Sequence, residues 1–242
     1  MVVFPIDMFT ILIPTHNEEN RIEETLEALF FYLLKHYRKT DFEVVIIDDG
    51  KDRTAEKVQD FGKDQGRIRF YHFPERLGKG AALMAGFRRA RGHAIITYDA
   101  DGAIPPREMP RMLEELRKFD LVIGSRAHRK SDIYGRIPLR RRIASLTFNS
   151  LVNLLFGLGI KDTQCGFKGI RVSAVKKLLP LLKLRGFEWD VELLAKARRH
   201  GFSVSEIGIE WHHKKEGKVK ITDTARMLAG VLKLKVEMMR DA

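Results

Sequence analysis

The sequence predicts an α/β fold, a mostly parallel sheet flanked by helices, and three observations lead to this prediction. Short runs of β-branched and apolar residues recur along the chain, segments of helical periodicity separate them, and acidic or amide residues directly follow several of the runs. Strands that alternate with helices pair in parallel and are covered by those helices. In such sheets, ligands bind at the carboxyl ends of the strands.

The first predicted strand covers residues 9–14 and the second covers residues 42–47, because both are short apolar runs. The segment between them predicts a helix, since apolar residues recur at three- and four-residue steps: Ile22, Leu26, Leu29 and Leu33. The alternation continues with expected helices over residues 54–61 and 80–90 and after Pro105-Pro106, and with expected strands over residues 68–73, 94–98 and 121–123.

The pattern changes in the second half, where Arg136 and residues 140–142 are basic and residues 143–160 form a long uncharged run. Its length meets the minimum for a membrane-spanning helix. Polar residues at four-residue steps, which lipid surroundings disfavour, also occur along it: Ser145, Asn149 and Asn153. The alternatives are a buried or groove-lining helix and a helix that lies in the membrane interface beside the arginines. The final expected helix, residues 224–239, is consistent with core packing or with membrane contact.

Charge and cysteine content narrow the class of protein. Lysine and arginine total 44 against 32 acidic residues, for a formal net charge of +12. This surplus favours nucleic acid, anionic lipid or phosphorylated substrates as partners, although a charge-rich surface also serves solubility alone. Cys165 is the only cysteine, which excludes an intrachain disulfide and a cysteine-rich zinc site. Residues 1–8 lack the pattern of a secretory signal, so we expect a cytoplasmic protein.

The clearest chemical signal is Asp99-Ala100-Asp101, directly after the strand expected to end at residue 98. Side chains two apart on an extended segment point the same way, so both carboxylates can face one divalent cation. Mg²⁺ or Mn²⁺ suits such a pair, since a hard cation bound with phosphates needs few protein ligands. Acidic pairs also cap helices and turns, but the position at a strand end favours the metal site.

Two other strand ends carry polar groups. The first strand ends in residues 14–18 (PTHNE) and the second in Asp48-Asp49-Gly50, where a carboxylate can accept hydrogen bonds from a base or ribose or can cap the next helix. Lys79, in residues 77–80 (LGKG) before a predicted helix, either faces a diphosphate or is solvated in a turn. Three consecutive strand ends therefore point to one polar crevice.

In this order the motifs, together with Gly124-Ser125-Arg126, resemble those of family 2 glycosyltransferases of the GT-A fold. The second half is similar to dolichyl-phosphate β-glucosyltransferases and, less closely, to dolichyl-phosphate mannose synthases. This similarity lies in residues 162–168 (DTQCGFK), 187–192 (FEWDVE) and 211–220. The resemblance spans nearly the whole chain.

The resemblance implies one GT-A domain over residues 1–242, with a nucleotide-sugar-binding half (1–125) and an acceptor-binding half with amphipathic helices (126–242). It implies an inverting transfer of a hexose from UDP-glucose to dolichyl or another polyprenyl phosphate, by a peripheral protein at the cytoplasmic face of a membrane. The implied nucleoside-binding residues are Pro14, His16, Glu18 and Asp49. The implied metal ligands are Asp99, which alternatively binds the ribose, and Asp101. The implied acceptor-phosphate residues are Arg126, Arg141 and Ser145.

Three positions depart from the common family pattern. His16 stands where a tyrosine is usual, and the loop after Asp49 is shorter than the common form. Ala103 occupies the place of a glutamine that helps to bind metal in the mannose synthases. Because residues 99–103 (DADGA) match the glucosyl branch, glucose is favoured over mannose.

The expected chemistry needs alignment and charge neutralisation more than a base. A phosphate monoester has a second pKa of about 6, so a lipid phosphate is already an anionic nucleophile near neutral pH. We therefore expect a cation at Asp101 and the guanidinium of Arg126 to carry catalysis. Asp162 is expected to orient the donor sugar, to act as a base for an alcohol acceptor, or to cap a turn. Asp190 and Glu192 diverge if helical, so a shared metal site is not expected there.

The set of nucleotide-binding residues that we predict also includes Asp48 and Lys79. The basic segment after Trp211 is predicted to close over the acceptor phosphate or to be a solvated loop, and its predicted phosphate-binding residues are Lys214, Lys215 and Lys218. Outside the leading prediction stand a GDP-mannose-dependent synthase, a basic nucleic-acid-binding module and an inactive membrane scaffold. Acidic groups at three strand ends repel nucleic acid, so we expect no such partner. Intact Asp99 and Asp101 argue against the scaffold.

Overall fold

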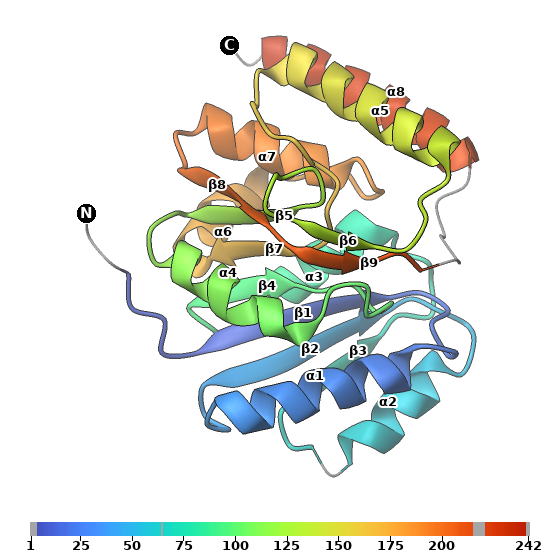
Figure 1. Ribbon diagram of the computed structural model, residues 1–242, viewed down its shortest axis with the longest axis vertical. Coiled ribbons are helices and arrows are strands. Elements are labelled where there is room, and N and C mark those ends of the chain that lie inside the picture. The colour runs from blue at the N-terminus through green and yellow to red at the C-terminus, as the bar shows by residue number, and fades with distance from the viewer. Residues whose placement is uncertain (1–3, 64, 215–220, 241–242) are drawn as a thin grey trace.

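The computed structural model describes residues 4–63, 65–214 and 221–240. Seven strands form one sheet in the order β3-β2-β1-β4-β7-β5-β8 (Figure 1). They are β1 (Phe9–Thr15), β2 (Phe42–Asp48), β3 (Ile68–His72), β4 (Ala94–Thr97), β5 (Leu121–Ser125), β7 (Lys168–Arg171) and β8 (Val204–Gly208). Only β7 runs antiparallel to its neighbours, β4 and β5. The predicted mostly parallel sheet is therefore confirmed.

Helices cover both faces of this sheet, with α1, α2 and α4 on one side and α3, α6 and α7 on the other (Figure 1). They are α1 (Ile22–His36), α2 (Thr54–Gly62), α3 (Lys79–Phe87), α4 (Met109–Leu116), α6 (Val172–Leu178) and α7 (Trp189–Arg199), and short 3₁₀ turns η1 (Pro106–Glu108) and η2 (Leu179–Leu181) precede α4 and follow α6. Cover on both faces explains why β2 is buried at every position and why its residues 44–47 are all apolar.

The apolar face of α1 packs into the core as its periodicity predicts. Ile22, Leu26, Leu29 and Leu33 are all fully buried there. Phe30 adds an edge-to-face contact with Phe42 of β2, with ring centroids 6.2 Å apart. This packing fixes α1, which connects β1 to β2. Because β1 and β2 are parallel, the polar turns that follow them lie at the same edge of the sheet.

Four strands of the second half lay outside the sequence prediction. Two of them, β7 and β8, complete the main sheet, and the other two, β6 (Asp132–Tyr134) and β9 (Glu210–His212), form a separate two-stranded parallel sheet. The backbone N–H of His212 donates a hydrogen bond to the carbonyl of Ala103 at 2.8 Å. The small sheet is thus joined to the loop that carries Asp99 and Asp101.

Two long helices, α5 (Leu139–Phe156) and α8 (Ile221–Arg240), lie side by side at one end of the molecule (Figure 1). In α5 only Val152 is buried, so this helix is not a buried one, whereas a groove-lining helix and a helix in the membrane interface stay predictions. Within the part of the chain that the structure describes, no helix is long and apolar enough to cross a membrane. In α8, Val231 and Leu234 pack into the core while Val236 and Met239 are exposed, so this helix combines core packing with an outward apolar face.

Candidate active site

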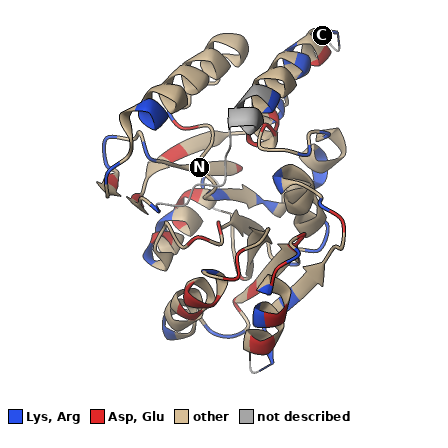
Figure 2. Ribbon diagram, turned by 90° about the vertical axis from the view of Figure 1, so that its right-hand side faces the viewer, with Lys and Arg blue, Asp and Glu red and all other residues tan. Residues whose placement is uncertain are grey.

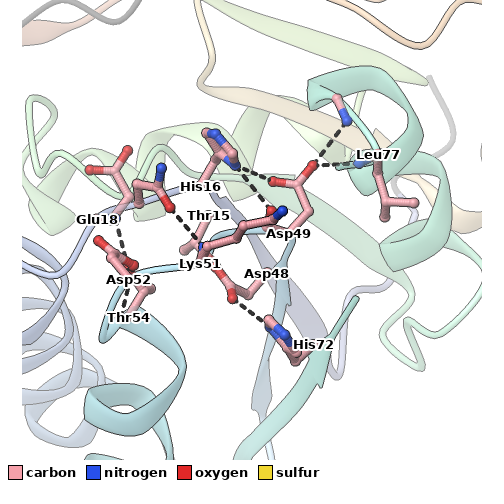
Figure 3. A network of polar contacts seen from close by, with 12 residues as sticks. Thr15, His16, Glu18, Asp48, Asp49, Lys51, Asp52, Thr54, His72 and Leu77 are labelled. Carbon is pink, nitrogen blue, oxygen red and sulfur yellow. Dashed lines mark hydrogen bonds and ion pairs between the residues drawn. The ribbon is translucent and has the colours of Figure 1, made fainter. Parts of the chain in front are cut away.

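Parallel pairing brings the ends of β1, β2 and β4 to the same edge of the sheet, as the sequence predicts. Asp49, just after β2, is 4% exposed and lies between the first strand's end and the start of α3 (Figure 3). Its Oδ2 accepts hydrogen bonds from the backbone N–H groups of Leu77 (2.7 Å) and Gly78 (2.9 Å). Its Oδ1 lies 2.8 Å from Nδ1 of His16. Asp49 therefore joins three chain segments at the strand ends that form the predicted crevice.

Asp48 and Asp49 are adjacent in the sequence but point in different directions. Asp48 is 1% exposed. Its Oδ1 accepts a hydrogen bond from Oγ1 of Thr15 at 2.8 Å, and its Oδ2 lies 2.8 Å from Nδ1 of His72 (Figure 3). The Asp48 carboxylate consequently ties β1, β2 and β3 together beneath the crevice, and its predicted contact with nucleotide remains a prediction.

The other predicted nucleoside-binding residues lie around the same strand end. Pro14 belongs to β1 and pairs in register with Ile47 of β2. Glu18 accepts a short hydrogen bond from the guanidinium of Arg21 at 2.6 Å, and its backbone N–H donates to Oγ1 of Thr54 at 2.7 Å. His16 keeps a third of its side-chain surface exposed beside Asp49. The imidazole ring of His16, the carboxylate of Glu18 and the end of β1 therefore lie at the same edge of the sheet.

Lys79, the first residue of α3, points at the acidic groups rather than into solvent. Its side chain is 18% exposed, and Nζ lies 3.4 Å from Oδ1 of Asp99 and 3.9 Å from Oδ2 of Asp190. Burial acts to lower the pKa of Lys79, but the two carboxylates outweigh it and raise the pKa above its usual value. Of the two predicted environments, the solvated turn is therefore wrong.

Asp99 is fixed between Lys79 and the backbone of residue 166. A Cβ atom placed on Gly166 would lie 1.9 Å from Oδ2 of Asp99, so only glycine fits that position. The carboxylate is still 42% exposed. Asp99 is therefore held in place on one side and open to a ligand on the other.

Asp101 is the second acid of the predicted metal pair. Burial and the negative charge of Asp99 raise the pKa of Asp101 above its usual value. Its Oδ1 also accepts a hydrogen bond from the backbone N–H of Ala103 at 3.0 Å. Among the described residues no cluster of three or more His, Cys, Asp or Glu residues could hold a metal. Two carboxylates that repel each other fit a Mg²⁺ or Mn²⁺ ion whose other ligands are phosphate and water.

Arg126 and Asp162, both predicted as catalytic, form a two-pronged ion pair. Nε of Arg126 donates to Oδ2 of Asp162 at 2.7 Å and its second terminal nitrogen donates to Oδ1 at 2.9 Å. The backbone N–H of Arg126 adds a third bond at 3.0 Å. Burial alone would raise the pKa of Asp162, yet Arg126 lowers it below its usual value. An ionised, fully engaged carboxylate is suited to orienting Arg126 and poorly suited to taking a proton.

The predicted acceptor-phosphate residues are only partly brought together. Arg126 lies at the crevice with its guanidinium 5.6 Å from the ring centre of Trp211. Arg141 and Ser145 are exposed on α5, and their predicted contact with the acceptor phosphate stays a prediction. Lys214 is half-buried at the end of the segment after β9. Lys215 and Lys218 lie outside the described residues, so their part of the prediction is not addressed.

Sequence analysis missed the partner of Asp190. Lys168, in β7, is fully buried, and its Nζ donates to Oδ1 of Asp190 at 2.7 Å. Glu192 turns the other way and accepts hydrogen bonds from the backbone N–H groups of Lys183 and Leu184. The divergence of the two acids is confirmed. A lysine between Phe167 and Ile170 on an apolar strand is the signal that could have indicated a buried ion pair.

Comparison with known proteins now decides the family. The sequence model described as "Glycosyl transferase family 2" matches residues 10–179. The chain belongs to glycosyl transferase family 2. The resemblance inferred from the motifs is thereby confirmed.

Relatives of this family 2 chain share most of its length. It is 34% identical over 235 residues to a dolichyl-phosphate beta-glucosyltransferase of Trichomonas vaginalis, a match that covers 93% of this chain and 72% of the relative. It is 30% identical over 222 residues to a dolichyl-phosphate beta-glucosyltransferase of Homo sapiens, over 86% of this chain and 68% of the relative.

The fold is also shared with a solved glycosyltransferase. Glucosyl-3-phosphoglycerate synthase of Mycobacterium tuberculosis, in complex with Mn²⁺, uridine diphosphate and phosphoglyceric acid, superposes with a TM-score of 0.73. The superposition covers 95% of this chain and 78% of that chain at 17% sequence identity. At that identity the likeness shows the fold alone, and it confirms the predicted GT-A architecture of this family 2 chain.

Cys165, in the DTQCGFK motif of this family 2 chain, is expected to be chemically inert in the folded state. Burial, aided by the charge of Asp162, raises the pKa of its thiol to about 12, and the side chain is 2% exposed. Near pH 8 the nucleophilic thiolate is therefore scarce and enclosed. We expect a thiol reagent to label the native protein at least about a hundredfold more slowly than the urea-unfolded protein. The variant Ser150→Cys, on the exposed surface of α5, is the positive control and should be labelled rapidly.

Proposed function

We propose that this family 2 glycosyltransferase moves glucose from UDP-glucose to dolichyl or another polyprenyl phosphate. One observation carries the proposal: Asp49, after β2, accepts hydrogen bonds from the backbone N–H groups of Leu77 and Gly78, and the next residue, Lys79, lies 3.4 Å from Asp99, after β4. Arg126 is near enough to Asp99 that the charge of this acid helps to raise the pKa of Arg126. Anion-binding and cation-binding groups thus face one crevice. The matching relatives that are named dolichyl-phosphate beta-glucosyltransferases support the choice of sugar and acceptor.

The donor side is supported by the polar rim of β1, β2 and β4. His16 and Glu18 are proposed to contact the nucleoside, with Asp49 holding the loop of Leu77 and Gly78 around it. Asp99 and Asp101 are proposed to hold Mg²⁺ or Mn²⁺ against the diphosphate. A divalent ion there supplies charge neutralisation of the departing diphosphate. Two carboxylates two residues apart after β4, with Asp99 42% exposed, support the proposed cation site, and the raised pKa of Asp101, caused by burial and by the charge of Asp99, agrees with it.

The acceptor side is supported by Arg126. Because Asp162 and Trp211 hold its guanidinium from two directions, the remaining donors of Arg126 have a fixed orientation in which they can bind a phosphate oxygen. We propose that one oxygen of the lipid phosphate attacks the anomeric carbon as the bond from that carbon to the diphosphate oxygen breaks. UDP leaves with the electron pair, and no protein base takes a proton, since the phosphate is ionised near pH 7. Asp162 in this scheme orients Arg126.

Membrane contact is proposed for the end of the molecule formed by α5 and α8. Leu139, Ile143 and Leu154 of α5 are 70%, 55% and 82% exposed, and the arginines at residues 140–142 are exposed beside them. Figure 2 shows these charges at one end of α5, whose remaining length is uncharged. Exposed apolar side chains with adjacent arginines suit the boundary between lipid headgroups and acyl chains. In this proposal the lipid phosphate reaches Arg126 from that end of the molecule.

The test is a transfer assay with purified protein, polyprenyl phosphate in detergent or vesicles, and either Mn²⁺ or EDTA. Radiolabelled UDP-glucose, GDP-mannose and UDP-N-acetylglucosamine are compared as donors, and polyprenyl phosphate is compared with the free polyprenol. We expect label in the lipid only with UDP-glucose, with the phosphate acceptor and with metal. Transfer from GDP-mannose alone would replace the proposed donor, and transfer to the free alcohol would refute the proposed nucleophile.

The close approach of Gly166 to Asp99 leads to a prediction for the same assay. The variant Gly166→Ala must push the Asp99 carboxylate aside, because its Cβ would lie within 3 Å of three atoms of that carboxylate. We expect kcat/KM to fall about a hundredfold, a loss that a displacement of about 1 Å in a positioned group can cause. Gly66→Ala is the matched control, since nothing lies within 4 Å of the added Cβ. Activity of Gly166→Ala near that of the control would show that Asp99 does not need its observed position.

A further inference from the structure

Four charged side chains form a continuous series that begins at the crevice and ends in the core. Asp99, after β4, lies 3.4 Å from Lys79 of α3, and Lys79 lies 3.9 Å from Asp190 of α7. Asp190 in turn accepts a hydrogen bond from Lys168 of β7 at 2.7 Å. The charges alternate in sign along the series. Only its first member, Asp99, is substantially open to the crevice.

The buried ion pair of Asp190 with Lys168 holds Lys79 in position. Lys168 is fully buried and Asp190 is 3% exposed, so their ion pair is shielded from solvent. Lys168 also donates to the carbonyl of Cys165, which fixes its ammonium group. A shielded pair of this kind is held in one arrangement because either charge alone would be costly. Asp190 can therefore hold Lys79 beside Asp99 without moving.

Lys79 stands where it competes with a divalent ion. Asp99 is one of the two carboxylates proposed to bind that ion, and the ammonium group of Lys79 already offsets part of its charge at 3.4 Å. Two cations within a few ångströms of one carboxylate repel each other. A diphosphate in the crevice changes the balance, because it offers Lys79 an alternative anion and offers the metal additional oxygen ligands.

We propose that Lys79 is a built-in counter-cation for Asp99, held in place by the Asp190–Lys168 pair, that opposes metal binding until the donor's diphosphate draws it away. The proposal rests on the proposed function, since it takes the donor to be a nucleotide diphosphate sugar. It assigns Lys79 two opposite effects: weaker binding of metal alone and tighter binding of nucleotide. It also makes metal and nucleotide bind cooperatively, each favouring the other by the same factor.

The test measures the two effects separately in the variant Lys79→Gln. Free Mn²⁺ is measured by electron paramagnetic resonance during titration of nucleotide-free protein, and UDP binding is measured by calorimetry in EDTA. We expect Mn²⁺ to bind Lys79→Gln about tenfold more tightly than the wild type, because the competing charge is gone. We expect UDP without metal to bind about tenfold more weakly. A variant that had merely lost its structure would bind both more weakly.

Two further variants serve as controls. Lys79→Arg keeps the charge and should bind Mn²⁺ within about threefold of the wild type. Lys118→Gln removes a partly exposed lysine just after α4 that pairs with Glu115, and it should change neither affinity. Unchanged or weaker Mn²⁺ binding by Lys79→Gln overturns the proposal, and so does the lack of Mn²⁺ binding by every variant.

The outcome is separable from that of the proposed function. Binding of Mn²⁺ and of UDP requires no acceptor, so it can be measured even if polyprenyl phosphate is not the substrate. Glucose transfer by the wild type combined with unchanged Mn²⁺ binding by Lys79→Gln would overturn the role of Lys79 and leave the proposed reaction intact. Tighter Mn²⁺ binding and weaker UDP binding by Lys79→Gln, without glucose transfer by the wild type, would support the role of Lys79 and refute polyprenyl phosphate as the acceptor.

Discussion

The variant Asp101→Asn is expected to lose at least about a thousandfold in kcat/KM for glucose transfer while its thermal stability stays the same or rises. Asparagine keeps the size of the side chain and the oxygen that accepts the hydrogen bond from Ala103. It removes the negative charge that the proposed metal requires, and loss of a metal's charge stabilisation is worth several kcal/mol in the transition state. The measurement is single-substrate kinetics with UDP-glucose alongside thermal unfolding.

The expected gain in stability follows from the sign of the pKa shift. Burial and the charge of Asp99 raise the pKa of Asp101 above its value in the unfolded chain. An ionised carboxylate with a raised pKa destabilises the folded state at every pH above the unfolded-state pKa, because the unfolded chain holds the charge more easily. Removing the charge therefore relieves the folded protein near pH 7, and the relief disappears at low pH, where the carboxyl is neutral in both states.

A matched control separates charge from folding. Asp60→Asn removes an exposed acid on α2 that pairs with Lys63 at 2.7 Å, and it should change neither the rate nor the melting temperature appreciably. Retention of more than a tenth of wild-type activity by Asp101→Asn would contradict the proposed metal site. A large fall in melting temperature would instead show that Asp101 is structural.

The sequence predicts the strands of this fold best where both of their faces are buried. β1 and β2 are apolar along most of their length, which marks them without any tertiary information. β6 is exposed at all three positions and β9 is half-buried, so neither shows an apolar run or a clear alternation. The insertion of β7 between β4 and β5 depends on long-range pairing that local patterns do not encode.

The candidate site, too, is only partly predictable from the sequence. Polar groups at strand ends identify the crevice, because parallel strands bring their carboxyl ends together. Local sequence does not decide which of Asp48 and Asp49 faces the crevice, and the structure shows Asp48 enclosed by Thr15 and His72. Local sequence also does not reveal the ion pair between Arg126 and Asp162, because the two residues lie in separate loops. Such pairs are set by packing of the whole domain.

The variant Lys168→Met is expected to lower the free energy of unfolding by about 3–5 kcal/mol, the usual cost of removing one member of a buried ion pair. Methionine fills much of the same volume, so the loss is chiefly electrostatic. It leaves Asp190 at 3% exposure with only Lys79, 3.9 Å away, to oppose its charge. Urea unfolding followed by circular dichroism and by tryptophan fluorescence measures the change, since agreement of the two probes justifies a two-state treatment.

The double variant Lys168→Met/Asp190→Leu tests the electrostatic origin of that loss. Removing both charges leaves no enclosed ion without its partner, and well-packed apolar replacements of buried pairs are often close to neutral. The double variant should therefore recover most of the stability that Lys168→Met loses, whereas a loss caused by cavities or strain would grow with the second substitution. Lys118→Met, which breaks a surface pair with Glu115, should cost less than about 1 kcal/mol. If Lys168→Met also lowered the free energy of unfolding by less than about 1 kcal/mol, the buried ion pair of Lys168 with Asp190 would not stabilise the fold as we expect.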